Sequence, residues 1–160
     1  MKNILVVLLV LLTACASPAI PPAPDMVAVQ HTFSTQAWVP DLYSCASEMG
    51  VALSIETRAA DFFDSSTQLW IRLGEPAEIP STAYEIGTEE IVIISHPDNP
   101  VHSLTLADIR ALFSGEIRNW DELGGDDLPV QVWTFGPSED IRQIFDATVM
   151  LQQPISSEAR

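Results

Sequence analysis

Positive charge is scarce in this chain. Only 7 of its 160 residues are Lys or Arg, against 22 Asp and Glu residues, which gives a formal net charge of −15. Lys2 is the only lysine. Such an acidic surface repels both nucleic acid and anionic lipid head groups. We therefore expect no nucleic-acid partner, and membrane attachment only through a covalent anchor.

Cysteine is scarce too, with 2 residues in the chain. Cys15 follows the apolar run 4–12 and a small residue, which is typical of a bacterial lipoprotein signal peptide. We interpret residues 1–15 as that peptide and Cys15 as the lipidation site; an ordinary signal peptide with an incidental cysteine is the alternative. Cys45 is then left alone, which excludes an internal disulfide. We expect Cys45 to be a buried, small apolar residue on a helix.

A proline-rich stretch, residues 16–25, follows the signal peptide. Its prolines exclude a helix or a central strand and favour an extended tether. The protein is therefore expected outside the cytoplasm, anchored to the bacterial cell membrane by lipid on Cys15. About 135 residues remain, enough for one modest domain.

Groups that carry out catalysis or bind metals are also few. His31, His96 and His102 lack the spacing of metal ligands, so we expect no metal site. The sequence has no nucleophile motif of the Gly-x-Ser-x-Gly kind and no paired catalytic carboxylates. We expect a protein that is not an enzyme and needs no cofactor.

Apolar segments that read as strands alternate with segments that read as helices. This alternation predicts an α/β protein with mostly parallel strands. The predicted strands are residues 25–30, 51–57, 69–73, 91–95 and 129–135, and the main predicted helices are 39–49, 105–114 and a last helix from Ser138.

The sequence contains residue patterns that predict the N-termini of two helices. Thr105 stands in the N-cap position with Asp108 three residues later, which predicts a capping box, and Gly115 closes that helix. Ser138 is predicted to cap the last helix, whose first turn contains Glu139 and Asp140.

Three short motifs carry a resemblance to a known family. Residues 99–105 (NPVHSLT), 109–115 (IRALFSG) and 119–120 (NW) resemble a block of the phosphate-binding-type solute receptors of ABC transporters. These receptors belong to the type-2 periplasmic binding protein superfamily. Residues 72–76 (RLGEP) resemble a loop in lipoprotein members. The resemblance extends from about Val27 to the C-terminus.

The resemblance implies two α/β lobes with a ligand in the cleft between them. Receptors of this family are about twice as long as this chain, so it is interpreted as a truncated N-terminal portion, with half of a receptor as the alternative. On that basis residues 26–90 form the N-terminal part of lobe I. Residues 91–160 form the crossing strand and a partial lobe II. The two-lobed fold is thus incomplete in this chain.

The family's anion site is altered in this sequence. Ser138 matches a family serine, but Thr134 stands where an Arg is usual, and Glu139 and Asp140 replace Gly and Thr. Gln68 likewise stands at about the place of a family carboxylate that accepts a proton from phosphate. Acidic residues in a first turn stabilise the helix by about 0.3–1 kcal/mol each, and they repel a dianion. The stretch therefore predicts a self-capped helix; a phosphate cradle is the alternative.

Hydroxyls between the first strand and the first helix are the other candidate ligand contacts. Thr32, Ser34 and Thr35 stand where the family offers hydroxyls to its ligand, although an ordinary capping loop explains them equally well. Ser34, Thr35 and Ser138 are the candidate ligand-binding residues. The predicted function is a non-catalytic, lipid-anchored receptor for a small solute, phosphate or another oxyanion, which delivers it to an ABC permease. The alternative is a structural or signalling envelope protein with a degenerate anion site.

Overall fold

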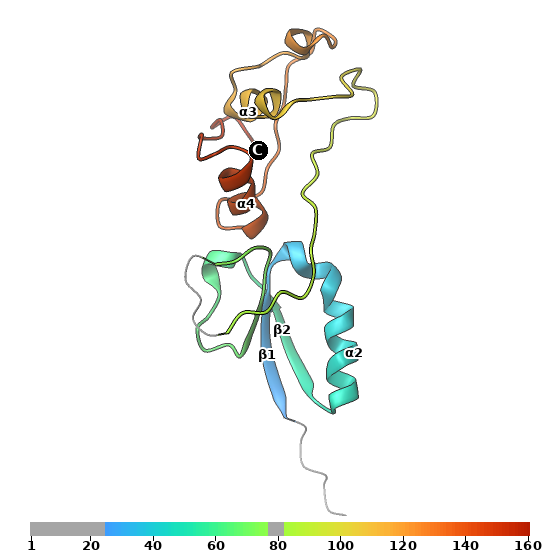
Figure 1. Ribbon diagram of the computed structural model, residues 1–160, viewed down its shortest axis with the longest axis vertical. Helices are drawn as coiled ribbons and strands as arrows, with labels where there is room; N and C mark the ends of the chain where they lie inside the picture. The colour runs from blue at the N-terminus through green and yellow to red at the C-terminus, as the bar shows by residue number, and fades with distance from the viewer. Residues whose placement is uncertain (1–24, 77–81) are drawn as a thin grey trace, which may run out of the picture.

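The computed structural model describes residues 25–76 and 82–160 (Figure 1). The predicted signal peptide, Cys15 and all of the tether before Asp25 lie outside the described residues. Within the described ranges, no helix is both long enough and apolar enough to span a bilayer. The elements form two groups, which we call the N-terminal unit (residues 25–76) and the C-terminal unit (residues 106–160), joined by a connecting segment (residues 82–105).

The N-terminal unit is a parallel sheet with a helix beside it. The strands are β1 (Met26–His31), β2 (Ala52–Thr57) and β3 (Leu69–Ile71), in the order β2-β1-β3. Both strand pairs are parallel, as predicted. A 3₁₀ helix, η1 (Phe33–Trp38), leads into α2 (Val39–Met49), and Gly50 ends α2 in the left-handed conformation. A short 3₁₀ turn, η2 (Ala60–Phe62), lies between β2 and β3.

β1 is the central strand of the sheet, and its C-terminal half is buried. Val29, Gln30 and His31 are all buried, because β1 has a neighbour on each side. All three strands are parallel, so the segments that follow them leave the sheet at the same edge. The backbone N–H of Thr32, just after β1, donates to the carbonyl of Ile71 at the end of β3, over 3.1 Å. The chain after β1 is thereby tied to the chain after β3.

The C-terminal unit is built around two helices, α3 (Leu106–Ser114) and α4 (Asp140–Thr148), with a 3₁₀ turn, η3 (Trp120–Leu123), between them. The rings of Phe113 and Phe145 lie 4.7 Å apart, centroid to centroid. Leu112, Phe145 and Met150 are buried. The predicted capping box at Thr105 and Asp108 is confirmed, and Gly115 ends α3 with a positive φ.

The prediction of a strand at residues 91–95 is wrong. The connecting segment runs extended between the two units (Figure 1), and no strand is found in it. Val92 is 70% exposed and Ile94 is 88% exposed. A strand requires a neighbour to hydrogen-bond, and no described segment pairs with these residues. Apolar content alone was therefore not sufficient evidence for a strand.

The strand predicted at residues 129–135 is also not formed. Only an isolated antiparallel bridge joins Pro129 to Asn119. Farther along, Thr134 donates to the carbonyl of Arg160, and Arg160 donates to the carbonyl of Val132. The segment is extended and partly paired, but among the described residues no further strand lies beside it to make a sheet.

The expected burial of Cys45 is wrong as well. Cys45 lies on α2 as predicted, but it is exposed. The buried residue of α2 is its neighbour Ala46. Successive helical residues are rotated by about 100° around the axis, so adjacent positions do not share a face.

Candidate binding site between the two units

A buried carboxylate lies where the two units meet. Asp140, the first residue of α4, is 0% exposed. Its Oδ2 accepts hydrogen bonds from Thr32 Oγ1 (2.6 Å) and from the backbone N–H of Leu73 (2.7 Å). Its Oδ1 accepts from Ser34 Oγ (2.8 Å) and from the N–H of Ile141 (2.7 Å). We call Asp140 and these four donor residues the Asp140 cluster.

The topology explains why these donors converge. Thr32 and Ser34 follow the carboxyl end of β1, and Leu73 follows that of β3. Parallel strands bring such segments to one edge of the sheet, which is the usual place for ligands in α/β folds. Figure 1 shows α4 over that edge, so Asp140 meets residues that are 67 to 108 positions away in sequence.

Neutral donors compensate the charge of Asp140. The ion pairs found among the described residues do not include Asp140. The guanidinium of Arg72, one residue before Leu73, donates to Gln143 Oε1 (3.0 Å) and to the carbonyl of Leu73 (3.2 Å). The carboxylate is also at the N-terminus of α4, where the helix dipole favours negative charge. Hydroxyls, amides and a helix terminus are the groups that proteins use to hold small anions.

A second layer of hydrogen bonds holds the loop after β1 in place. The carbonyl of Thr32 accepts from Thr35 Oγ1 (3.0 Å) and lies 2.8 Å from His31 Nδ1. The other ring nitrogen of His31 lies 2.9 Å from Thr57 Oγ1 on β2. His31, Thr32 and Thr35 are all at least 97% buried. The backbone of Thr32, whose hydroxyl donates to Asp140, is therefore held in place by its neighbours.

A polar bridge flanks the cluster. The side-chain amide of Gln143 on α4 accepts from Arg72 and donates to Asp61 Oδ1 (2.8 Å). The N–H of Asp61 donates to the carbonyl of Ser138 over 3.4 Å. The start of α4 is thus joined to the N-terminal unit at several points around Asp140.

Comparison with known proteins identifies the family. The family model described as "PBP superfamily domain" matches residues 62–159, more than half of the chain. The chain belongs to the PBP superfamily. Among solved structures it is similar to an X-ray structure from Clostridium perfringens, described as a phosphate ABC transporter substrate-binding protein with bound phosphate. The TM-score is 0.59 at 20% sequence identity, which shows a shared fold.

The coverage of that structural match is unequal. It extends over 85% of this PBP-superfamily chain and 61% of the other chain. The chain therefore spans less than two thirds of the length of the structure it resembles. The predicted α/β class with parallel strands, and the resemblance to phosphate-binding-type receptors, are both confirmed.

The PBP fold brings two of the three candidate ligand-binding residues into or beside the cluster. Ser34 is one of the four donors to Asp140, and Thr35 supports the loop through the carbonyl of Thr32. Ser138 is half-buried next to the start of α4. The prediction that it caps α4 is wrong, because the N-cap residue is Glu139 and no side-chain cap bond is formed. Asp140 bonds the N–H of Ile141 in its place.

Sequence reasoning missed Asp140 as a site residue. The signal was present, since two adjacent acids replace the family's Gly and Thr at a helix start. They were interpreted as local capping residues. The side chain of Asp140 instead points across to the other unit, which local spacing does not reveal.

Glu139 is placed less favourably than its neighbour. Its Oε2 is buried and has no hydrogen-bond partner among the described residues. Burial, and second the charge of Asp140, raise the pKa of Glu139 above its usual value. An anion bound at the cluster would therefore lie close to two carboxyl groups, those of Glu139 and Asp140.

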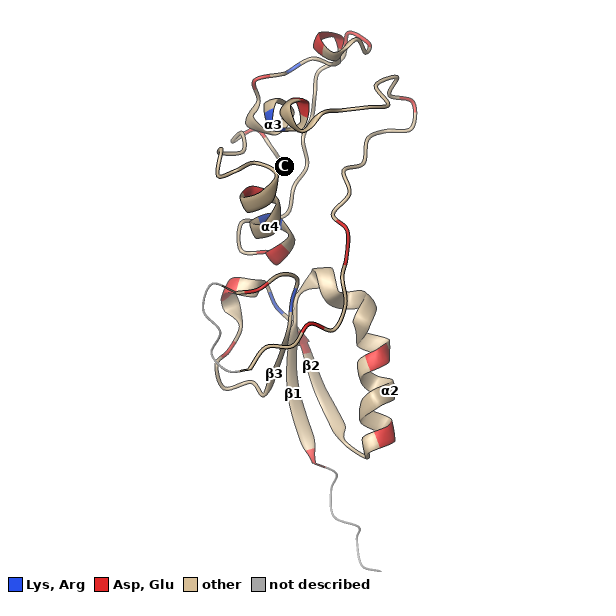
Figure 2. Cartoon of the chain, viewed as in Figure 1, with Lys and Arg blue, Asp and Glu red and all other residues tan. Residues whose placement is uncertain are grey.

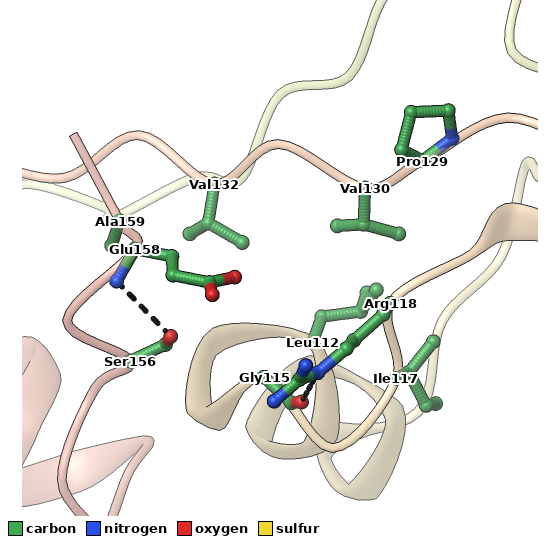
Figure 3. Close-up of a pocket in the computed structure, with 10 residues that line it drawn as sticks. All are labelled: Leu112, Gly115, Ile117, Arg118, Pro129, Val130, Val132, Ser156, Glu158 and Ala159. Carbon is green, nitrogen blue, oxygen red and sulfur yellow. Dashed lines mark hydrogen bonds between the residues drawn. The ribbon is translucent and has the colours of Figure 1, made fainter.

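A cavity of about 210 Å³ lies elsewhere, within the C-terminal unit (Figure 3). Val130 and Val132 point into it from one side, and Leu112 of α3 lies across from them. Arg118 and Glu158 line it as well, and Arg118 donates to the carbonyl of Gly115. Drug-sized ligands usually occupy roughly 300–1,000 Å³, so this cavity is small for such a ligand.

The charge distribution agrees with the composition. Figure 2 shows acidic residues on both units and along the connecting segment, with few basic positions between them. Within residues 25–76 and 82–160, no group of three or more His, Cys, Asp or Glu side chains is arranged to hold a metal ion.

Proposed function

We propose that this chain is the ligand-binding part of an extracytoplasmic solute receptor that serves an ABC importer and carries out no catalysis. One observation carries the proposal: polar groups from the sheet edge and from the start of α4 meet at a single buried point between two units. Binding sites in α/β folds lie at such edges. Because the chain shares its fold with a protein described as a phosphate ABC transporter substrate-binding protein, phosphate is the reference solute for a binding test.

The proposed mechanism is capture between the two units. A solute stabilises the closed arrangement only through contacts that the open arrangement lacks. Ser34 and Ser138 are the candidate contacts, because both are half-buried and lie on opposite units. The proton of the Ser34 hydroxyl is donated to Asp140, so in this arrangement Ser34 can offer a solute only its lone pairs. The hydroxyl of Thr35 is buried and donates to the carbonyl of Thr32 over 3.0 Å, so we propose that it supports the loop.

Thermal-shift titration of the full-length protein, purified in detergent, tests this function. The panel contains phosphate, sulfate, amino acids and sugars. A bound solute at 100 times its dissociation constant stabilises the protein by about 2.7 kcal/mol, which is a readily measured shift. Ser34→Ala and Ser138→Ala are expected to weaken that shift, whereas Ser157→Ala, at an exposed position of the C-terminal unit, is not. A panel without any saturable shift would contradict the proposal.

Lipid anchoring on Cys15 belongs to the same proposal. Cys15→Ser should move the protein from the membrane fraction to the soluble fraction of its host. The mass of the released wild-type N-terminus should include the lipid. A wild-type protein with an unmodified Cys15 would remove the anchor from the proposal.

A second candidate is a structural or signalling envelope protein that reuses the PBP fold. The filled hydrogen-bonding positions of the Asp140 cluster favour it, because they leave few donors for a solute. A protein that stays in the membrane fraction but binds no member of the panel would support this candidate over the receptor.

A further inference from the structure

The Asp140 carboxylate is held as a bound anion would be held. Four donors contact its two oxygens at 2.6–2.8 Å, two on each oxygen. Three of the donors belong to the N-terminal unit, and the acceptor belongs to the C-terminal unit. None of the donors is a cation.

The carboxylate has no bonding capacity left for a solute. An ionised carboxyl group offers about four lone-pair sites, and four donors already use them. The group is also 0% exposed, so neither an ammonium ligand nor water reaches it. This excludes a role for Asp140 as the partner of a cationic solute in the arrangement seen here.

The same geometry excludes a free oxyanion from the cluster. Thr32 Oγ1 and the N–H of Leu73 have one proton each, and both protons are directed at Asp140 Oδ2. An incoming phosphate would have to displace that oxygen. It would also approach the charges of Asp140 and Glu139, with no cation of the cluster to offset them.

We propose that Asp140 is a built-in anion: its carboxylate fills the oxyanion pocket between the units, excludes free phosphate, and joins the units without a solute. This inference rests on the proposed function in one respect, that the cluster marks the solute position of a receptor. On this proposal, Asp140 is the residue that determines which solutes are excluded from the pocket.

Truncation of the side chain provides the direct test. Asp140→Ala removes the carboxylate and leaves the Thr32 and Ser34 hydroxyls and the Leu73 N–H directed at a space of carboxylate size. Formate is the free counterpart of the removed group. We expect the thermal midpoint of full-length Asp140→Ala protein to be lowered and then raised saturably by formate. The rise should be roughly 3–5 °C at ten times the dissociation constant.

The controls separate pocket binding from general salt effects. Sodium chloride at matched ionic strength should not reproduce the rise. Formamide has the shape of formate without its charge and should not reproduce it either. Asp146→Ala removes another carboxylate of α4, one that pairs with Arg142, and should show no formate-specific rise. Wild-type protein should show no saturable response to formate or phosphate.

Each outcome decides the inference. A formate-specific rise confined to Asp140→Ala supports it. Asp140→Ala protein that does not respond to formate, or wild-type protein that binds phosphate saturably, overturns it. If Asp140→Ala does not fold unaided, the refolding yield in formate against chloride becomes the readout, and equal yields overturn the inference.

Failure of the inference is distinguishable from failure of the receptor function. Phosphate binding by the wild type would overturn the built-in anion and would support the receptor. Formate rescue of Asp140→Ala, together with a wild type that binds no solute in the panel, would support the carboxylate as the group that fills this space and joins the units. It would overturn the receptor, and with it the interpretation of this space as a solute position.

Discussion

The N-termini of α3 and α4 use the same residue type in opposite ways. At α3, Asp108 folds back on its own helix: its Oδ2 accepts from the N–H and the hydroxyl of Thr105, three residues away. At α4, Asp140 reaches Thr32 and Leu73 in the other unit. The first carboxylate completes a local cap, and the second connects two parts of the fold.

The difference shows that an acidic first turn has two distinct energetic roles. Exposed caps exchange hydrogen bonds with water for hydrogen bonds with the backbone, at a modest net gain. A carboxylate buried with four donors is different, because its removal leaves those donors without partners. Four substitutions test how far the two helix starts differ.

Asp140→Asn is expected to have the largest effect. The amide has the same shape, but its nitrogen cannot accept the hydrogen bonds that one carboxylate oxygen now accepts from two donors. A buried donor without a partner costs about 1–3 kcal/mol, so the loss in unfolding free energy should be roughly 2–5 kcal/mol. Urea denaturation at neutral pH measures it. A loss no larger than that of an ordinary cap would remove the contrast between the two helices.

Thr32→Val should have the next largest effect. Valine keeps the shape of threonine but removes the hydroxyl that donates to Asp140 over 2.6 Å. A hydrogen bond to a charged group contributes about 1.5–3 kcal/mol, and a loss of that size is expected. Thr148→Val is the matched control, since its hydroxyl donates to the carbonyl of Ile144 within α4 and, among the described residues, to no other group. Equal losses in the two variants would contradict a special role for Asp140.

The sequence predicted the local features of both units well. The capping box at Thr105, the end of α2 at Gly50, and strands within one or two residues of β1, β2 and β3 all follow from patterns that span a few residues. Neighbours along the chain determine these features, so a linear pattern is enough to find them.

Features that depend on distant partners were predicted poorly. Residues 91–95 have the composition of a buried strand, but strand formation depends on a neighbour, and none is found among the described residues. For Asp140 the reason is the opposite. The sequence predicted a side chain that caps its own helix, but distant residues are present and donate hydrogen bonds to its carboxylate. Ser34 was singled out by the family resemblance, and not by the local pattern. The structure shows that it donates to Asp140, and its contact with a ligand stays a prediction.

Thr105→Ala should cost less than either change in the Asp140 cluster. It removes the hydroxyl that accepts from the N–H of Asp108 and donates to its carboxylate. Loss of a Thr N-cap typically lowers the free energy of unfolding by about 1 kcal/mol. Thr105→Ser keeps the hydroxyl and is the matched control. An unchanged urea midpoint in Thr105→Ala would show that α3 does not depend on its cap.

The α3 cap also has a pH dependence. The N–H of Thr105, and then its hydroxyl, hold the pKa of Asp108 below its usual value. A lowered pKa contributes stability above the pKa of the unfolded chain, near 3.9, and this stability is lost as the pH falls through the folded value. Thr105→Ala should therefore reduce the acid sensitivity of the protein below about pH 4.

Glu139→Gln should have the smallest effect and the opposite pH dependence. Because burial and Asp140 raise the pKa of Glu139, the folded state holds its proton more tightly than the unfolded chain does. Its contribution is complete below the unfolded pKa, near 4.3, and declines as the pH rises through the folded value. Gln cannot ionise, so the variant should gain stability over wild type as the pH rises. Urea titrations between pH 4 and 7 measure the gain, with Glu85→Gln in the exposed connecting segment as control.

A stability difference that does not change with pH would show that the charge of Glu139 does not destabilise the start of α4. The contrast with Asp108 at the start of α3 would then rest on Asp140 alone.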